Sequence, residues 1–178
     1  MYRILFFLFV FSLPAHGKHP YFIERVQPIR QSLMRLSPKL ESNKIEHLSQ
    51  LIYSAGERFK IDYRVFILIL YVESNFNQKA KSHTGDFSIA QINLSQWKHP
   101  KNRKRLEKTG HYLESATLNE SFAIEIMAEI LHLAYKERGK KDIHWYATYH
   151  SKSAKYKNAY IKRIDRAFNK IKDIKFKF

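Results

Sequence analysis

The sequence predicts one compact, mainly α-helical domain, because of its length, its apolar content and the spacing of its apolar residues. A chain of 178 residues fits one domain better than two. Hydrophobic residues make up 44% of it and aromatic residues 15%, which is enough for a core and excludes a wholly disordered chain. With only five glycines and five prolines, a many-turned β-sandwich is a poor fit. Apolar residues recur at helical spacing over much of the chain.

The first two predicted elements precede residue 74. Asn43, with Glu46 three residues later, is typical of a helix start, and apolar residues follow at alternating threes and fours over 45–59. Asp62 can cap a second element over 63–72. This element is apolar on all sides, so its pattern fits either a buried helix or a central strand.

The second half is predicted to begin irregularly and to end in two helices. Residues 74–118 hold most of the turn formers, with one helical turn expected over 88–91. Residues 117–120 form a capping box for a long helix that ends before Gly139. A further helical pattern starts at Tyr156, where a packed helix with a basic outer face fits better than a membrane-surface helix.

Residues 1–17 are predicted to be a secretory signal peptide. A short basic start precedes a ten-residue apolar stretch at 4–13, and Ala15-His16-Gly17 provides a small-residue end. The apolar stretch is too short to span a bilayer; a buried strand or an uncleaved anchor is the alternative. Cleavage after Gly17 leaves one domain, residues 18–178, in the periplasm or outside the cell. No later segment reaches transmembrane length without charges.

The charge of the chain predicts polyanionic partners. There are 32 Lys and Arg against 16 Asp and Glu, a net charge of +16, and residues 98–108 concentrate several of the cations. Such a field favours nucleic acid, an anionic membrane surface or the cell wall, and predicted export favours the wall over nucleic acid. The absence of cysteine excludes disulfides and thiol nucleophiles. Without an HExxH or other ligand spacing, we expect no metal and no cofactor. We expect a monomer.

Glu73 is the candidate catalytic residue. If 63–73 is helical, Glu73 shares a buried stripe with Phe66 and Ile69. Burial of a carboxyl group favours its protonated form, which a general acid needs. The alternative is a glutamate at a helix end that turns out to solvent.

The residues after Glu73 resemble a known enzyme family. An E-S-N-F segment at 73–76 is followed by S-x-x-G at 82–85, Q-I-N at 91–93 and A-x-Y at 147–149. This ordered set resembles the lysozyme-like lytic transglycosylases, or SLT domains, that cleave peptidoglycan. The similarity extends over about 45–164 and implies an α+β lysozyme-like fold. In size and export signal the chain is most similar to the small transglycosylases of secretion, conjugation and pilus systems, which implies such an apparatus as a partner.

The resemblance implies a role for each matching residue. Glu73 would be the sole acid and base, protonating the oxygen between N-acetylmuramic acid and N-acetylglucosamine and then accepting the proton of the muramyl C6 hydroxyl. The product would be a 1,6-anhydro sugar, formed without water. The residues expected to bind substrate or to line its groove are Ser74, Ser82, Ser88, Gln91, Tyr149 and His150.

Several positions depart from the family pattern. Ser88 replaces a glycine, Ile89-Ala90 replaces Leu-Met, and His150 replaces an asparagine. Asp86 stands where the family has a small residue, and we expect a solvated turn residue there. The alternatives to a transglycosylase are a hydrolytic lysozyme, which would use a group such as Asp86 to position water, and a non-catalytic wall-binding assembly protein. An exported protein that binds anionic lipid or DNA is a further alternative.

Overall fold

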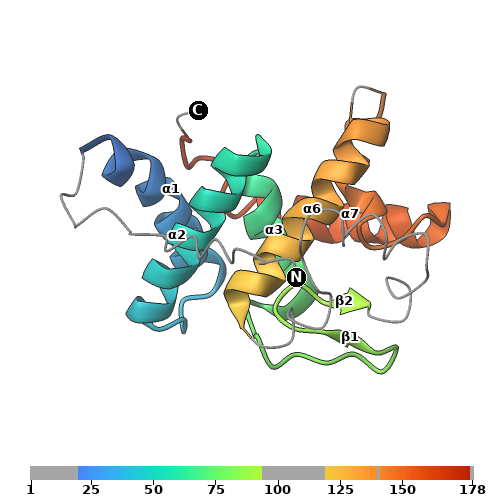
Figure 1. Cartoon of the computed structure of the whole chain (residues 1–178), viewed down its shortest axis with the longest axis horizontal. Coiled ribbons are helices and arrows are strands. Elements are labelled where there is room, and N and C mark those ends of the chain that lie inside the picture. The colour runs from blue at the N-terminus through green and yellow to red at the C-terminus, as the bar shows by residue number, and fades with distance from the viewer. Residues whose placement is uncertain (1–19, 94–118, 140, 177–178) are drawn as a thin grey trace, which may run out of the picture.

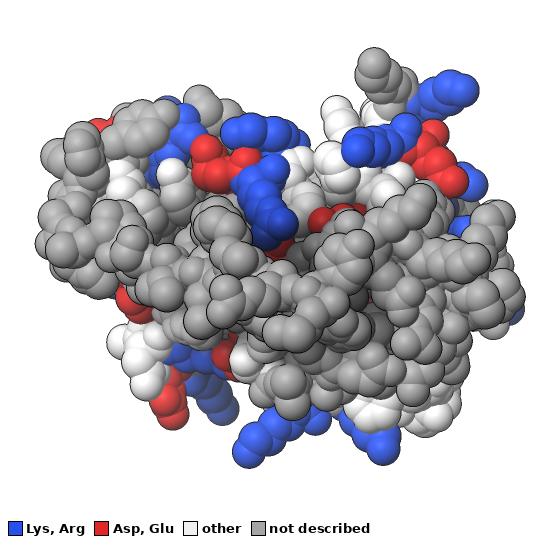
Figure 2. All heavy atoms as spheres, viewed as in Figure 1, with Lys and Arg blue, Asp and Glu red and all other residues white. Residues whose placement is uncertain are grey.

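Helices make up most of the described chain in this computed structural model, and one small hairpin joins them (Figure 1). The structure describes residues 20–93, 119–139 and 141–176. The predicted signal peptide at 1–17 and the basic residues at 98–108 lie outside these ranges. Around the edges of one face, lysine and arginine side chains project from the described parts (Figure 2).

Helices α1 (Pro20–Leu36) and α2 (Ser42–Phe59) pack against each other on one side of the molecule (Figure 1). The predicted start at Asn43 is one residue late, because Glu41 occupies the N-cap position. The sequence reasoning missed α1, which carries a proline, Pro28, inside the helix. Both helices bury an apolar stripe, and α2 also packs against α6.

Helix α3 (Tyr63–Ser74) is the buried centre of the fold. The Asp62 side chain caps it by accepting from the Arg64 backbone N–H at 2.8 Å, as predicted. The apolar run is a helix and not a strand because other helices surround it: α1, α2 and α7 all pack against α3. The helix ends where Asn75 adopts a left-handed conformation.

A short hairpin follows α3. Strands β1 (Asp86–Phe87) and β2 (Ile92–Asn93) pair antiparallel. Ser88 lies in the connecting turn with a φ of 74°, which is the backbone region that favours glycine. The serine found in place of the family's glycine is therefore accommodated in a left-handed conformation.

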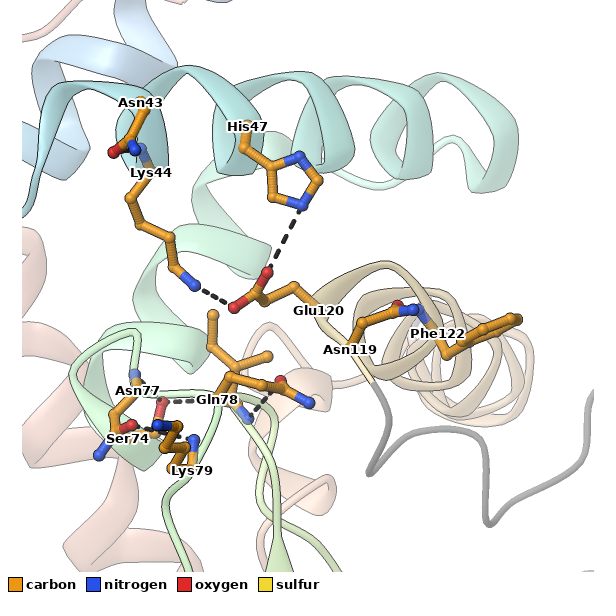
Figure 3. A network of polar contacts seen from close by, with 11 residues as sticks. Asn43, Lys44, His47, Ser74, Asn77, Gln78, Lys79, Asn119, Glu120 and Phe122 are labelled. Atoms are coloured by element: carbon orange, nitrogen blue, oxygen red, sulfur yellow. Dashed lines mark hydrogen bonds and ion pairs between the residues drawn. The ribbon is translucent and has the colours of Figure 1, made fainter.

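Helix α6 (Glu120–Arg138) begins with a cap from Asn119, whose side chain accepts from the Phe122 backbone N–H at 3.1 Å. Thr117 of the predicted capping box lies outside the described residues. Glu120 then joins α6 to α2, because Lys44 and His47 both pair with its carboxylate (Figure 3). The helix ends at Arg138, with Gly139 as its C-cap, as predicted.

The chain closes with a short 3-10 helix, η2 (Trp145–Thr148), and helix α7 (Ala154–Phe168). Helix α7 packs against both α3 and η2, burying Tyr160 and Ile164. The outer face of α7 is basic, as predicted. Among the described residues, no helix is both long and apolar enough to cross a membrane.

Candidate active site

Glu73 lies in the wall of a polar pocket. It is the second-last residue of α3, and its side chain is 9% exposed. The position on the buried side of the helix end is the one that its spacing from Phe66 and Ile69 predicts. The pocket has a volume of about 330 Å³ and is lined by Glu73, Thr84, Asp86, Gln91, Ile92, Asn93, Tyr149, His150, Ser151 and Tyr156. The end of α3, the hairpin and the segment between η2 and α7 therefore meet at one cavity.

His150 stands directly beside Glu73. Its Nδ1 lies 3.5 Å from Glu73 Oε1. The imidazole ring stacks on the ring of Tyr160, with centroids 4.5 Å apart and planes 2° from parallel. The stack comes from α7, so this helix orients the histidine that faces the carboxyl group. His150 can donate a hydrogen bond to Glu73 or to a bound sugar through its ring nitrogens.

Tyr160 is a site residue that the sequence reasoning assigned only to the core. Tyr160 is 1% exposed, and its hydroxyl forms no hydrogen bond with any of the described residues. Burial, followed by the nearby Glu73 carboxylate, raises the pKa of Tyr160 well above its ordinary value. The hydroxyl therefore stays protonated and can donate to Glu73 after a small shift of either group. The available sequence signal was a hydroxyl on the otherwise apolar stripe of α7.

Tyr149 braces the hairpin turn. Its hydroxyl donates to the Ala90 backbone carbonyl at 2.6 Å. Burial is the main cause that raises the pKa of Tyr149, and the carboxylates of Glu73 and Asp86 add to it. Tyr149 thus lines the pocket, but its hydroxyl binds a backbone carbonyl of the turn. This role differs from the direct contact with Glu73 or the sugar that a substrate-binding tyrosine would make.

Asp86 is not the solvated turn residue that turn propensity predicted. It is half-buried in β1 and lines the pocket. Its carboxylate accepts from Ser82 Oγ at 2.7 Å, Thr84 Oγ1 at 2.7 Å and Asn93 Nδ2 at 2.6 Å. Burial opposes ionisation, but these three hydrogen bonds and the attraction of His150 outweigh it and lower the pKa of Asp86. A second, ionised carboxyl group therefore shares the pocket with Glu73.

The remaining predicted site residues fall into two groups: one lines the pocket, and the others hold the elements around it. Gln91 lines the pocket, and its side-chain amide donates to the carbonyls of Ala80 and Ser88 at 3.0 Å each. The three serines do not line the pocket. Ser74 donates to the Ile89 carbonyl at 2.7 Å, which ties α3 to the turn. Ser82 donates to Asp86, and Ser88, in the hairpin turn, is 2% exposed.

No metal centre is formed by the described residues. In the ranges that the structure covers, no three His, Asp or Glu side chains are grouped so that they could hold a metal ion. The residues that line the pocket carry carboxyl, imidazole, amide and hydroxyl groups.

Comparison with known proteins gives one family. The family model described as the transglycosylase SLT domain matches residues 50–172, more than half of the chain. This range includes all of α3, the hairpin and α7, and thus every described residue that lines the pocket. None of the curated proteins compared with the chain matches it. The mainly helical fold and this match agree, and the chain belongs to the transglycosylase SLT domain family of peptidoglycan lytic transglycosylases.

Proposed function

We propose that this protein cleaves the β-1,4 bond between N-acetylmuramic acid and N-acetylglucosamine in peptidoglycan, with Glu73 as the single acid and base. The observation that carries the proposal is the position of Glu73: its side chain is 9% exposed, yet it lines a pocket of about 330 Å³. A carboxyl group that is shielded from bulk water and still reaches the pocket suits proton transfer to a bound glycan.

The reaction needs one proton carrier. The Glu73 carboxyl group donates its proton to the glycosidic oxygen as the bond from that oxygen to muramyl C1 breaks. The resulting carboxylate accepts the proton of the muramyl C6 hydroxyl, whose oxygen bonds to C1 and closes the 1,6-anhydro ring. Glu73 thus returns to its starting form and no water is consumed. This scheme differs from that of ordinary glycosidases, which use a pair of carboxyl groups.

The neighbours of Glu73 support its two proton transfers. After the first transfer Glu73 is an anion, and hydrogen bonds to the charged form stabilise it. His150, 3.5 Å away, and the buried hydroxyl of Tyr160 are the groups placed to donate them. Gln91 and Asn93 contribute amide groups to the same pocket, where they can hold sugar hydroxyls.

Hydrolysis by the same pocket is the second candidate, and Asp86 is the observation that favours it. The carboxyl group of Asp86 is ionised and lines the cavity into which Glu73 projects. A carboxylate across a pocket from a general acid can activate a water molecule. The product would then carry one water more than the anhydro sugar.

The experiment compares the products of the mature chain, residues 18–178, with those of Glu73→Gln. Peptidoglycan digests are analysed by mass spectrometry. We expect anhydro products from the wild type, and about 10²-fold or greater loss of cleavage in the variant, as for removal of a positioned general acid. Glu125→Gln is the matched control, because Glu125 pairs with Arg58 on α2, away from the pocket.

Each other outcome has a clear meaning. Products heavier by one water would establish the hydrolase. Near-normal cleavage by a folded Glu73→Gln variant would remove Glu73 from the mechanism. Binding to cell-wall sacculi without release of glycan would favour a wall-binding assembly protein.

We also propose that the protein is exported and remodels the wall locally for an envelope-spanning machine. Peptidoglycan, the substrate of the family, lies outside the cytoplasm. The predicted signal peptide at 1–17 and the net charge of +16 support export and attraction to the anionic wall.

A further inference from the structure

A second pocket lies at the end of α3 and the neighbouring face of α7. It has a volume of about 430 Å³ and is lined by Tyr71, Val72, Asn75, Arg163 and Arg166. None of these residues lines the pocket of Glu73. The two arginines come from the exposed face of α7, three positions apart and therefore on neighbouring turns of one side of the helix.

This arginine pocket is positively charged. Arg163 donates to the Val72 carbonyl through one nitrogen, which holds its guanidinium group at the pocket wall. Among the described residues, no acidic side chain forms an ion pair with Arg163 or Arg166. Asp165, the acidic residue between them, lines a different pocket with Phe168. Lys170, one turn further on, lies over the Tyr71 ring and adds a third cation.

The pocket adjoins the catalytic carboxyl group. Val72 and Asn75 line it, and they flank Glu73 along the chain. Arg163 also lies close enough to Tyr160 to affect the ionisation of its hydroxyl, and Tyr160 in turn lies beside Glu73. The end of α3 is thus shared between the two pockets: Glu73 lines one of them, and Val72 and Asn75 line the other.

We propose that the arginine pocket binds a carboxylate of the peptide stem that branches from the glycan strand near the bond to be cleaved. The proposal rests on the proposed function, since it requires peptidoglycan at Glu73. Peptidoglycan carries short peptides on the lactyl groups of its muramyl residues, and these peptides contain free carboxylates. The planar guanidinium group of arginine matches a carboxylate with two parallel hydrogen bonds. The enzyme would then prefer strands that bear peptides to strands that have lost them.

The test measures kcat/KM on two substrates, peptide-bearing glycan strands and strands stripped of peptides by an amidase. The readout is the ratio of the two values. For Arg166→Gln we expect this ratio to fall about tenfold, in line with the loss of a charge-assisted hydrogen bond. Arg138→Gln is the matched control, because Arg138 is an exposed arginine at the end of α6 and its loss changes the net charge equally.

A second variant guards against a folding effect. Arg163 also binds the end of α3, so Arg163→Lys keeps the charge and removes only the planar fork. We expect its ratio to fall as well. An equal loss on both substrates, or an unchanged ratio in both variants, would overturn the proposal. Competition assays with the wild type give a further check. If phosphate-rich wall polymers inhibit cleavage more strongly than free peptide stems do, the proposal is overturned. If the wild type cleaves neither substrate, the proposed function itself has failed.

Discussion

Replacement of Tyr149 by phenylalanine tests whether this tyrosine braces the hairpin turn or contacts the reacting groups. The Tyr149 hydroxyl donates to the Ala90 carbonyl at 2.6 Å, and Ala90 is fully buried. Tyr149→Phe removes the donor and leaves that carbonyl without it. A buried acceptor that loses its partner costs about 1–3 kcal/mol of the free energy of unfolding. For a domain of this size, each kcal/mol lowers Tm by roughly 2–4 °C.

The same turn carries residues of the pocket that Glu73 lines. Ser88 and Gln91, on either side of the braced carbonyl, both hold left-handed backbone conformations, with φ of 74° and 47°. Such conformations persist only where the surrounding structure holds them. We therefore expect Tyr149→Phe to loosen the turn and to lower kcat/KM by about tenfold through displacement of Gln91.

Thermal melts followed by circular dichroism, together with glycan-release assays, measure both effects. Tyr156→Phe is the matched control for stability, because Tyr156 lines the same pocket but is 58% exposed. A Tyr149→Phe variant as stable as the wild type would refute the bracing role. If its activity fell all the same, Tyr149 would instead act on the sugar or on Glu73.

Two further predictions concern the polar neighbours of Glu73. His150→Phe keeps a ring against Tyr160 but removes the nitrogens beside Glu73, so kcat should fall about tenfold with KM little changed. His150→Asn, which restores a polar side chain, should recover part of the lost kcat. Equal activity of the wild type and both variants in steady-state assays would exclude a polar role for His150. The pKa of Asp86 is lowered in the folded state, so its ionised carboxylate stabilises the fold. This contribution to the free energy of unfolding is fully present above the unfolded pKa of ~3.9 and is lost as pH falls through the lower folded pKa. Urea unfolding should therefore show Asp86→Asn to be less stable by roughly 1 kcal/mol near neutral pH, with a difference that shrinks below pH ~4; a constant difference would contradict this assignment.

The sequence predicted the fold correctly at positions where local backbone preference and tertiary packing favour the same structure. Asp62 caps α3 as expected, and Arg138 ends α6 as expected. The ambiguous run over 63–72 could not be assigned from its own pattern, because burial on all sides removes the periodicity that separates helix from strand. Helix α1 was missed, and the hairpin was missed because two-residue strands leave almost no alternation to detect.

The candidate site was predictable only in part. Glu73 could be placed from its spacing along a helix and from the motif that follows it. The roles of its neighbours depend on contacts between elements distant in the sequence, which no local pattern reports. Tyr160 reaches Glu73 only because α7 packs on α3, and the Tyr149 hydroxyl meets the carbonyl of Ala90, which lies 59 positions earlier in the chain.

The hydrogen bonds of Asp86 bear on the choice between the two candidate reactions. A carboxylate has about four sites at which it can accept a hydrogen bond, and three described side chains already donate to Asp86. A carboxylate with a lowered pKa is also a weaker base, and hydrolysis would require it to remove a proton from water. Asp86 is thus better suited to holding the hairpin that presents Gln91 and Asn93 to the pocket. Of the two carboxyl groups that line the pocket among the described residues, Asp86 is committed in this way and Glu73 is the one better placed to carry protons, which favours the anhydro product over the hydrolytic one.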